Sequence, residues 1–491
     1  MRTIDKEILR LALPSILANI TVPLVGMVDI AVAGHLSASA AALIGGISVG
    51  SLMFDMLYWN FGFLRAGTGG MTAQAYGRED WQECRTHLFR AVGTALLISL
   101  ALLMVQWPFQ KLVFLLVDCS AEVKSLALKY FFIRIWAAPA TLSLMAFRGW
   151  FIGMQDTFSS MLTDVIVNGV NILASIFLAL GIPGTAFKGI GFSGIAWGTI
   201  LAQYTGLFFA TGVVAVKYRQ KVRLPVKPGV PVGTGVTVGT GVTVPDGNVT
   251  GRPFTRTGRE AQGAPAPIAV RKESIHRFFA VNGDLFIRSL CLMVVYLAFT
   301  AISAKFGDVL LAMCSVMMKL MMIFSFFTDG FAFAGEALTG RFIGMERPEL
   351  LREGVRHTFA WSLGIGMMFV AIYLLFGMDM FRMMTSDSSV VGSAQGFLPW
   401  LVLMPLVGST AFTWDGIYTG ATRTKPLRNS TIGCMIAFFL VWFLGLMLLK
   451  PQGNSLVHLL FAAYYSHLIF RSVYLTVKYP SSIPSRIGSS E

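Results

Sequence analysis

The residues best placed to do chemistry in this sequence are acids and amides inside long apolar segments. Asp29 lies within PLVGMVDIAVAGHL (residues 23–36), which has the character of a helix in a bilayer. A carboxylate there costs at least about 2.5 kcal/mol on membrane-insertion scales. A neutral carboxylic acid is much cheaper to bury than a carboxylate. Asp29 is therefore a candidate for reversible protonation, and the alternative is an interfacial residue near a helix end.

A second apolar segment carries a stripe of polar residues. Asp164, Asn168, Asn171 and Ser175 follow the spacing i, i+4, i+7 and i+11, which places them along one helical stripe. Amides and hydroxyls can hydrogen-bond a carboxyl group in either protonation state, so this stripe is predicted to hold Asp29. The alternative is that these groups simply join neighbouring helices.

The second half of the chain has its own charged residues in apolar segments. These are Asp284, Arg288, Lys319, Asp329 and Asp415. Asp284 and Arg288 are four residues apart, which predicts an ion pair within one helix. Lys319 and Asp329 are ten apart and lie close to one helical face. The set is a candidate cation or substrate site, and a structural ion-pair network is the alternative.

Two charges in the first half allow more than one interpretation. Arg148 is expected at the membrane interface or paired with an acid. Asp55, near Tyr58 and Trp59, is expected to face a cavity or to pair with a neighbour in helix packing.

These residues require transmembrane helices to position them. The chain is 55% hydrophobic and 13% charged, about half the charged fraction of a soluble protein. Runs long enough to cross a bilayer occur at 10–33, 41–64, 89–108, 128–152, 160–182, 190–216, 280–304, 309–334, 358–378, 395–421, 429–449 and 455–476. The sequence therefore predicts an all-α polytopic membrane protein with twelve transmembrane helices. Pro14 and Pro23 each remove a backbone hydrogen bond from the first helix and mark a candidate hinge.

The sequence shows no motif that is typical of an enzyme. No G-x-x-x-x-G-K-[ST] loop is present, so ATP-driven work by this chain is not expected. The five cysteines and six histidines have neither metal-ligand nor nucleophile spacing. We expect no enzyme activity, no metal and no cofactor other than a coupling ion.

The basic charge is concentrated in the middle of the chain. Of the formal net charge of +14, residues 217–277 contribute eleven Lys/Arg against three acids. Positive loops stay in the cytoplasm, so this distribution predicts topology rather than a nucleic-acid partner. Both termini are then expected in the cytoplasm of a multi-pass plasma membrane protein, in a bacterium its inner membrane.

The two halves of the chain resemble each other. FLRAGTGGMTAQAYGRED (63–80) matches FAFAGEALTGRFIGMERPE (331–349), and RGWFIGMQDT (148–157) matches DGIYTGATRT (415–424), at offsets of 268 and 267. Each half has six predicted spans, so the repeats share one orientation about an axis along the membrane normal. The predicted organisation is an N-lobe at 1–217, a basic linker at 218–277 and a C-lobe at 278–491. A flexible tether is expected around 225–270, where VGTGVT is repeated.

Together, VDIAVAGHL, RGWFIGMQDT, the Asn-bearing fifth helix and WDGIYTGAT resemble the multidrug and toxic compound extrusion (MATE) family, particularly its DNA-damage-inducible F branch. The resemblance covers nearly the whole chain except the tether. It implies a V-shaped fold of two six-helix lobes and cation-coupled export, with Asp29 in the place of the proton-coupling acid and Pro14 at the bend of the first helix. Some members carry a second acid where this chain has Ser175. Sodium-coupled members use acids on helices 7 and 10, where Asp284 and Asp415 lie.

Three functions follow from these features. The first is a monomeric antiporter that exports cationic or amphipathic small molecules in exchange for protons. The alternatives are sodium-coupled export through the C-lobe acids and a flippase for lipid-linked saccharides. Flippases of that kind usually have a more basic cavity, whereas the charges predicted in these spans are mixed, which favours a cationic or zwitterionic substrate.

Overall fold

The structure is a computed structural model that describes residues 3–34, 36, 40–117, 119–181, 184–185, 187–219, 268–385 and 387–483. Within these residues twelve helical segments are long and apolar enough to cross a membrane, as predicted. The tether expected at 225–270 lies almost wholly outside the described residues.

The first six spans form the N-lobe. Its α-helices are α1 (Thr3–Gly34), α2 (Ala40–Tyr58), α3 (Phe63–Gly77), α4 (Trp81–Leu116), α5 (Ala121–Arg134), α6 (Ala138–Gly153), α7 (Thr157–Leu180) and α8 (Phe192–Lys217). Two of the spans contain a short 3-10 turn, η1 (Trp59–Gly62) between α2 and α3 and η2 (Ile135–Ala137) between α5 and α6.

The last six spans form the C-lobe. Its α-helices are α10 (Ile268–Ser303), α11 (Asp308–Gly344), α12 (Pro348–Met384), α13 (Ser388–Ala394), α14 (Leu398–Gly420), α15 (Thr424–Leu449) and α16 (Asn454–Ser482). The 3-10 turn η3 (Ala304–Phe306) follows α10, and η4 (Gln395–Phe397) interrupts the fourth span of this lobe as η2 does in the N-lobe.

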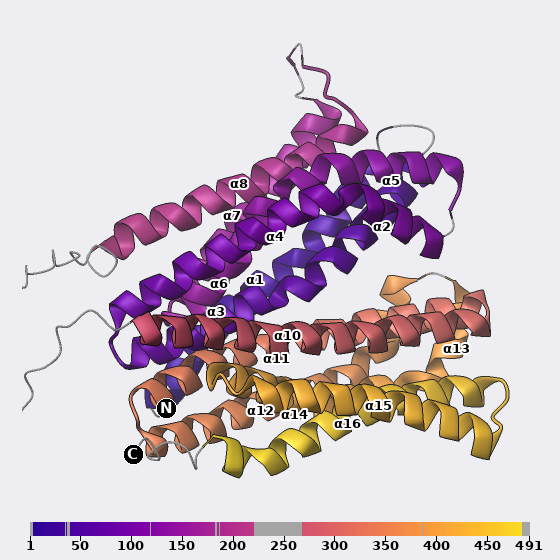
Figure 1. Ribbon diagram of the computed structural model, residues 1–491. Coiled ribbons are helices and arrows are strands. Elements are labelled where there is room, and N and C mark those ends of the chain that lie inside the picture. The colour runs from indigo at the N-terminus through magenta and orange to yellow at the C-terminus, as the bar shows by residue number, and fades with distance from the viewer. Residues whose placement is uncertain are drawn as a thin grey trace, which may run out of the picture.

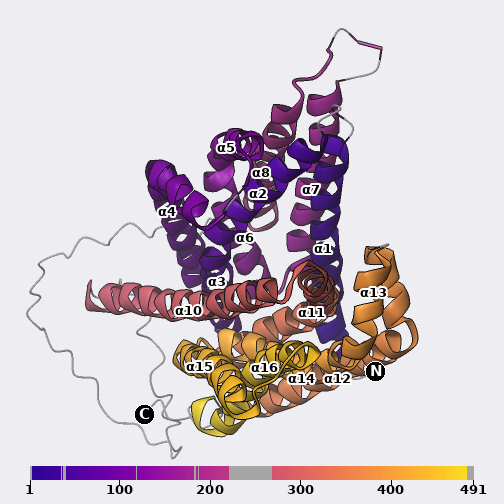
Figure 2. The ribbon, with the colours of Figure 1, turned by 90° about the vertical axis from the view of Figure 1, so that its right-hand side faces the viewer.

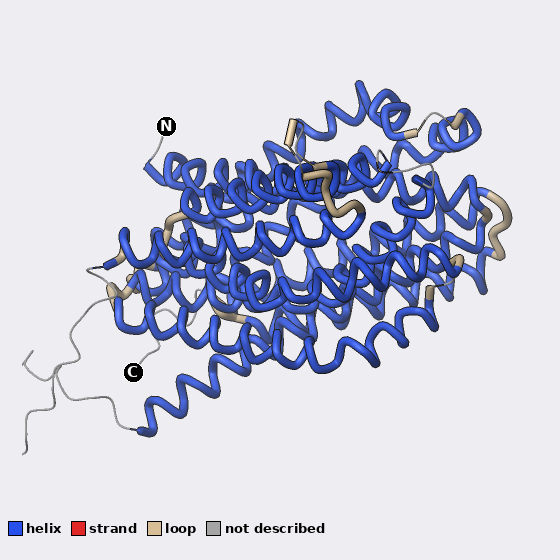
Figure 3. The backbone as a smooth tube through the Cα atoms, turned by 90° about the horizontal axis from the view of Figure 1, so that it is seen from above, coloured by secondary structure: helices blue, strands red, loops and turns tan. Residues whose placement is uncertain are grey.

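The two lobes are arranged as a V. They converge at the end of the molecule where both termini lie and diverge toward the opposite end (Figure 1). The view turned by 90° shows the N-lobe above the C-lobe, with α1 running from the C-lobe side up into its own lobe (Figure 2). Seen from above, the helices of both lobes run roughly along the same direction (Figure 3). The end at which the lobes converge is called the closed end below.

The predicted repeat is visible in the backbone. Positive φ angles of 52–60° occur at Glu79 and Glu346, and again at Gln155 and Thr422, and both pairs are separated by 267 residues. Each lies in a tight turn between helices at the closed end, which explains why the matched sequence motifs include these turns.

The repeated glycines of these motifs are packing positions. A Cβ on Gly149 would lie 2.1 Å from the carbonyl oxygen of Arg65, and one on Gly416 would lie 2.0 Å from that of Ala332. Small residues allow such close helix contacts in membranes. The G-x-x-x-G motifs therefore hold α6 against α3 and α14 against α11, and this role needs no substrate.

Glycines also bring the lobes together at the closed end. Gly77 of α3 and Gly344 of α11 lie so close that a Cβ on either would sit 2.9–3.0 Å from the Cα of the other. These two residues are 267 apart and so occupy equivalent places in the repeat. Nearby, the Gln74 side-chain amide donates to the Gly420 carbonyl oxygen at 3.1 Å, which joins α3 to α14.

Helix α1 is continuous despite its two prolines. Pro14 cannot donate to the carbonyl oxygen of Arg10, four residues earlier. The hydroxyl of Thr157 on α7 donates to that oxygen at 3.4 Å. The backbone carbonyl left free by the proline therefore has a partner on the neighbouring helix α7.

Candidate functional site

The N-lobe site is centred on Asp29 of α1. The side chain is 6% exposed, and its Oδ1 atom has no hydrogen-bond partner among the described residues. The Ser175 hydroxyl on α7 lies within hydrogen-bonding reach of the carboxyl group, and the Arg134 guanidinium on α5 is close enough to act on it electrostatically. Asp29 is thus buried, next to a cation, and incompletely satisfied.

Arg134 connects Asp29 to a second acid. Its guanidinium donates to the Tyr130 hydroxyl at 2.9 Å and lies over the Phe54 ring, 4.7 Å from the ring centroid. Asp29 and Asp55 both interact electrostatically with this arginine. Two acids therefore share one base. Sequence reasoning missed Arg134, although a lone cation within the apolar run YFFIRIW was a usable signal.

Asp55 faces the other lobe. It is exposed on α2 and interacts electrostatically with Lys319 of α11, which is also exposed. The Trp59 ring beside it packs against Tyr296 of α10, with ring centroids 5.8 Å apart. The space between the diverging lobes is therefore bordered by charge and aromatic surface from both sides, as expected if Asp55 faces a cavity.

The polar stripe of α7 has other partners than predicted. Asp164 forms an ion pair with Arg148 of α6 at 2.5 Å, which confirms that Arg148 is paired with an acid. The amide of Asn168 donates to the Thr21 hydroxyl of α1 at 2.5 Å.

Asn171 likewise bonds elsewhere, because its amide donates to the Thr199 hydroxyl of α8 at 3.1 Å. The expectation that Asp164, Asn168 and Asn171 hold Asp29 is therefore wrong for this conformation, and Ser175 is the stripe residue beside it. The helical spacing correctly placed these residues on one stripe of α7. It could not show which residue of the stripe lies at the same height in the membrane as Asp29 of α1.

In the C-lobe, the expected pair within α10 does not form. Asp284 accepts from Arg428 at 2.7 Å and from the Thr424 hydroxyl at 2.8 Å, both at the start of α15. Arg288 instead pairs with Asp415 of α14. The prediction of an Asp284–Arg288 ion pair is wrong because both side chains reach across to neighbouring helices.

Asp415 is held by two arginines. Besides Arg288, Arg471 of α16 contacts it, and its Nε donates to Asp415 Oδ1 at 2.9 Å. Arg471 is almost fully buried. Sequence reasoning did not single it out, although it is an isolated cation in the apolar run HLIFRSVYL.

A further ion pair joins the lobes beside this group. Arg65 of α3 contacts Glu336 of α11 at 3.1 Å, and Glu336 is only 1% exposed. Asp329 lies within electrostatic range of Arg65, Arg288 and Arg471 rather than of Lys319. These residues form the interlobe charge network, with three acids and three bases: Arg65, Arg288, Asp329, Glu336, Asp415 and Arg471. Arg65 and Glu336 were not predicted as functional.

The two charged sites differ in balance. The interlobe charge network has equal numbers of acids and bases, and contacts join most of them. The N-lobe group of Asp29, Asp55 and Arg134 has one acid in excess, and Lys319 faces it from the C-lobe. Asp29 Oδ1 lacks a partner among the described residues, as Glu336 Oε1 does in the interlobe charge network. Binding of a proton or a cation would therefore change the charge of the N-lobe group more easily than that of the interlobe charge network.

Comparison with known proteins identifies the family to which this arrangement of helices and charges belongs. A family model described as MatE matches residues 14–177 and again 285–449, one match in each lobe. The chain belongs to the MatE family. Within it, the chain is 30% identical over 450 residues to the DNA damage-inducible protein F of Escherichia coli (strain K12), covering 92% of this chain and 87% of that protein. It is also similar to a probable multidrug resistance protein NorM of Thermotoga maritima, 25% identical over 229 residues, covering 46% and 47% of the two chains.

Solved structures support the fold of this MatE family chain. A MOP superfamily transporter from Pyrococcus furiosus Vc1 superposes with a TM-score of 0.76 at 16% identity, covering 99% of this chain and 96% of the other. A crystal structure of MATE in the straight conformation gives a TM-score of 0.76 with the same identity and coverage. The MatE family consists of membrane transporters of drugs and toxins, so this chain is a multi-pass membrane transport protein.

Proposed function

We propose that this protein is a secondary antiporter that exports cationic or amphipathic small molecules in exchange for protons. The observation that carries the proposal is Asp29, a buried carboxyl group with one oxygen lacking a partner among the described residues. A proton can satisfy that oxygen, and the neutral acid is cheap to hold in an apolar lobe. A buried ionisable group in a membrane span is the default hypothesis for a functional site.

The charge balance of the N-lobe supports competition between a proton and a cation. With both acids ionised, the N-lobe residues Asp29, Asp55 and Arg134 carry one net negative charge. Lys319 of α11 faces Asp55 from the C-lobe, and an organic cation would compete with it for that charge. Protonation of Asp29 removes that charge and weakens the attraction. A cation and a proton would therefore exclude one another from the lobe, which is the requirement for exchange.

The C-lobe offers less support for sodium coupling. Asp284 is bound by Arg428 and Thr424, and Asp415 by Arg288 and Arg471. Sodium would have to displace these partners from both acids. Competition from arginines therefore favours protons over sodium as the coupling ion.

Alternating access follows from the V shape. The lobes converge at the end that holds the termini (Figure 1). With the termini in the cytoplasm, this conformation is open to the outside, and export requires the closed end to open in turn. A monomer in the bacterial inner membrane suffices for this cycle, because both lobes belong to one chain.

The test is transport of a cationic dye by purified protein in liposomes. Dye flux should follow an imposed pH gradient and remain unchanged when a sodium gradient is imposed instead. Flux that follows sodium and is lost in Asp415→Asn would show that the C-lobe couples transport. Absence of flux across a panel of organic cations, with movement of lipid-linked saccharide, would support the flippase.

A further inference from the structure

The two lobes touch along a line of equivalent residues at the closed end. The repeat offset of 267 joins residues of α3 to residues of α11 that lie against them. A Cβ on Gly340 would lie 2.4 Å from the Cβ of Ala73, and one on Gly77 would lie 2.9 Å from the Cα of Gly344. The interlobe seam consists of three such pairs, spaced four residues apart: Gly69 and Glu336, Ala73 and Gly340, and Gly77 and Gly344.

Glu336 is the one large residue of the interlobe seam. The other members are glycine or alanine, which allow helix backbones to approach closely. A Cβ on Gly69 would lie 2.1 Å from the Oε1 atom of Glu336, so the missing side chain of Gly69 leaves room for the carboxyl group. Glycine and alanine achieve the close packing at the other positions, so packing does not require an acid at this one.

The two carboxyl oxygens of Glu336 have different surroundings. Oε2 accepts from the Arg65 guanidinium at 3.1 Å, whereas Oε1 has no hydrogen-bond partner among the described residues. The side chain is only 1% exposed, so bulk water does not reach Oε1. A buried carboxylate oxygen without a partner is costly, and a proton bound to that oxygen removes its charge.

An acceptor for such a proton lies on the same side of the carboxyl group. The position of a Cβ on Gly69 is 2.1 Å from Glu336 Oε1 and 3.3 Å from the carbonyl oxygen of Gly149. Both oxygens therefore border the same small space. A carboxylate and a carbonyl oxygen repel each other there, whereas a protonated Oε1 can direct its proton toward the Gly149 carbonyl group.

The cations around Glu336 are shared with other acids. Arg65 of α3 and Arg288 of α10 act on Glu336 electrostatically and favour its ionised form. Asp329 of α11 lies within range of the same two arginines, and Asp415 of α14 is bound to Arg288. Arg65 is also 26% exposed, so water weakens its attraction for the carboxylate. Burial therefore opposes ionisation of Glu336 against cations that are only partly available to it.

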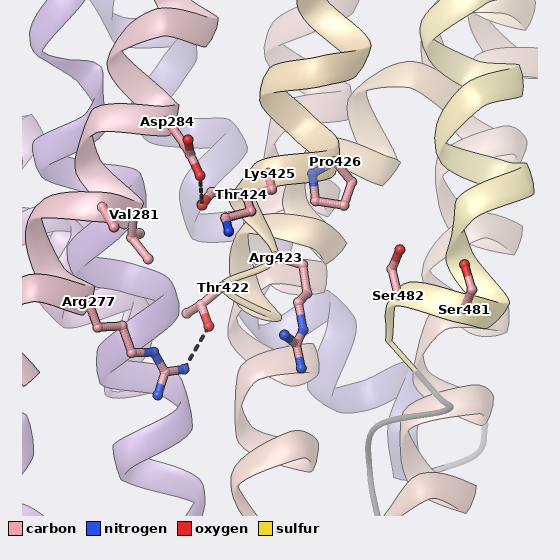
Figure 4. Close-up of a pocket in the computed structure, with 11 residues that line it drawn as sticks. Arg277, Val281, Asp284, Thr422, Arg423, Thr424, Lys425, Pro426, Ser481 and Ser482 are labelled. Carbon is pink, nitrogen blue, oxygen red and sulfur yellow. Dashed lines mark hydrogen bonds between the residues drawn. The ribbon is translucent and has the colours of Figure 1, made fainter. Parts of the chain in front are cut away.

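The other polar contacts between the lobes respond differently to pH. Arg277 of α10 donates to the Thr422 hydroxyl at 3.1 Å (Figure 4) and to Gln74 of α3 at 3.3 Å, and these groups do not change charge between pH 6 and pH 8. Histidine ordinarily does change charge in this range. His357 of α12 contacts Asp5 of α1 at 2.7 Å, so its effect must be separated from that of Glu336.

We propose that Glu336 is a second proton-binding site, which holds a proton on Oε1 while the lobes touch at the closed end and releases it to the cytoplasm when that end opens. Opening exposes the carboxyl group to water, where the ionised form is no longer costly. The shut form therefore binds the proton more tightly, and by linkage a bound proton keeps this end shut. Release on the cytoplasmic side is the direction that proton-driven export requires, so this inference rests on the proposed function.

The first experiment is a pH titration of the full-length protein in lipid nanodiscs, followed by infrared spectroscopy of protonated carboxyl groups. It uses Asp29→Asn protein, so that the proposed coupling acid does not contribute. Adding Glu336→Gln should remove one protonated carboxyl band at pH 6. Glu7→Gln is the matched control, because Glu7 also pairs with an arginine of α11, Arg341, but is 34% exposed. An exposed glutamate is ionised at pH 6, so this control should leave the band unchanged.

The second experiment measures opening of the closed end by the distance between two spin labels. Gln82→Cys of α4 and Glu349→Cys of α12 are exposed positions 267 residues apart, and Cys119→Ser removes the native cysteine that is not buried. From pH 6 to pH 8, the ratio of shut to open protein should fall about fivefold more in Asp29→Asn than in Asp29→Asn/Glu336→Gln, the scale set by one unsatisfied buried oxygen. His357 is present in both proteins, so its effect cancels in this comparison.

Three results would overturn the proposal. The first is an infrared spectrum that Glu336→Gln leaves unchanged down to pH 5, or that Glu7→Gln changes equally. The second is an equal pH response of the label distance with and without Glu336→Gln. Should Glu336→Gln fail to fold, Arg65→Gln decides, because loss of the cation should make the protonated band persist to higher pH, and an unmoved band is the third contrary result. None of these measurements requires transport, so the export proposal can fail separately.

Discussion

At the scale of single residues, Asp29 and Ser175 define the N-lobe site more closely than the rest of the polar stripe does. Ser175 is fully buried, and its single hydroxyl proton can go either to the Ile195 carbonyl oxygen of α8, 3.5 Å away, or to the acid. Asn171, one turn away, bonds to Thr199 instead. The two positions can therefore separate a role at Asp29 from general helix packing.

We predict that Ser175→Ala lowers dye export driven by a pH gradient about fivefold. A neutral hydrogen bond contributes about 1 kcal/mol, and its loss changes how easily Asp29 exchanges its proton. Asn171→Ala is the control and should reduce export less at equal expression. The measurement is the initial flux in liposomes, and a larger loss in Asn171→Ala than in Ser175→Ala would contradict the prediction.

At the scale of elements, the start of α7 shows how the closed end of the N-lobe is fixed. Asp156 lies in the turn between α6 and α7. Burial opposes ionisation of this carboxyl group, but hydrogen bonds from Lys217, Ser159 and Tyr218 outweigh it and lower the pKa of Asp156. A carboxyl group with a lowered pKa stabilises the folded state above its unfolded pKa, near 3.8, and loses this effect as the pH falls through its folded pKa.

Asp156→Ala should accordingly lower the unfolding temperature in detergent by about 2 °C at pH 7, since an N-cap contributes about 1 kcal/mol. The difference from the wild type should shrink as the pH falls below 3.8. Asp156→Asn keeps a capping side chain, so its unfolding temperature should fall less than that of Asp156→Ala. A difference that is the same at pH 3 and pH 7 would show that the charge of Asp156 does not matter.

The sequence predicted the elements better than their contacts. Twelve apolar runs gave the spans because length and composition decide whether a helix enters a bilayer. The partners of charged residues were harder to predict where they lie on other helices, and Asp284 is the clearest case. It lies one turn from Arg288 yet bonds to Arg428, 144 residues away. Glu336 was missed because its partner Arg65 lies in the other half of the chain.

At the scale of the whole molecule, the interlobe charge network must change when the closed end opens. The Arg65–Glu336 pair crosses between α3 and α11, and Glu336 has almost no exposure. Separating the lobes leaves this acid without its base unless water or a proton replaces it. Breaking one partner of a buried pair is costly, whereas replacing both with neutral groups is much less so.

We expect Arg65→Gln to lower the stability of the protein by about 2 kcal/mol, less than the 3–5 typical of fully buried pairs because Arg65 is partly exposed. The double variant Arg65→Gln/Glu336→Gln should recover most of this loss. Thermal unfolding in one detergent measures both. If the double variant is as unstable as the single one, the charges of the Arg65–Glu336 pair do not stabilise the contact between the lobes.

The most direct test of the whole proposal is proton release on binding of a cationic dye to the purified protein in weakly buffered detergent. The wild type should release up to about one proton per dye bound, because the two ligands compete for the N-lobe. Asp29→Asn, which mimics the protonated acid, should fold normally and release almost none even at dye concentrations that saturate it. Release from Asp29→Asn equal to that of the wild type would contradict the assignment of Asp29 as the coupling residue.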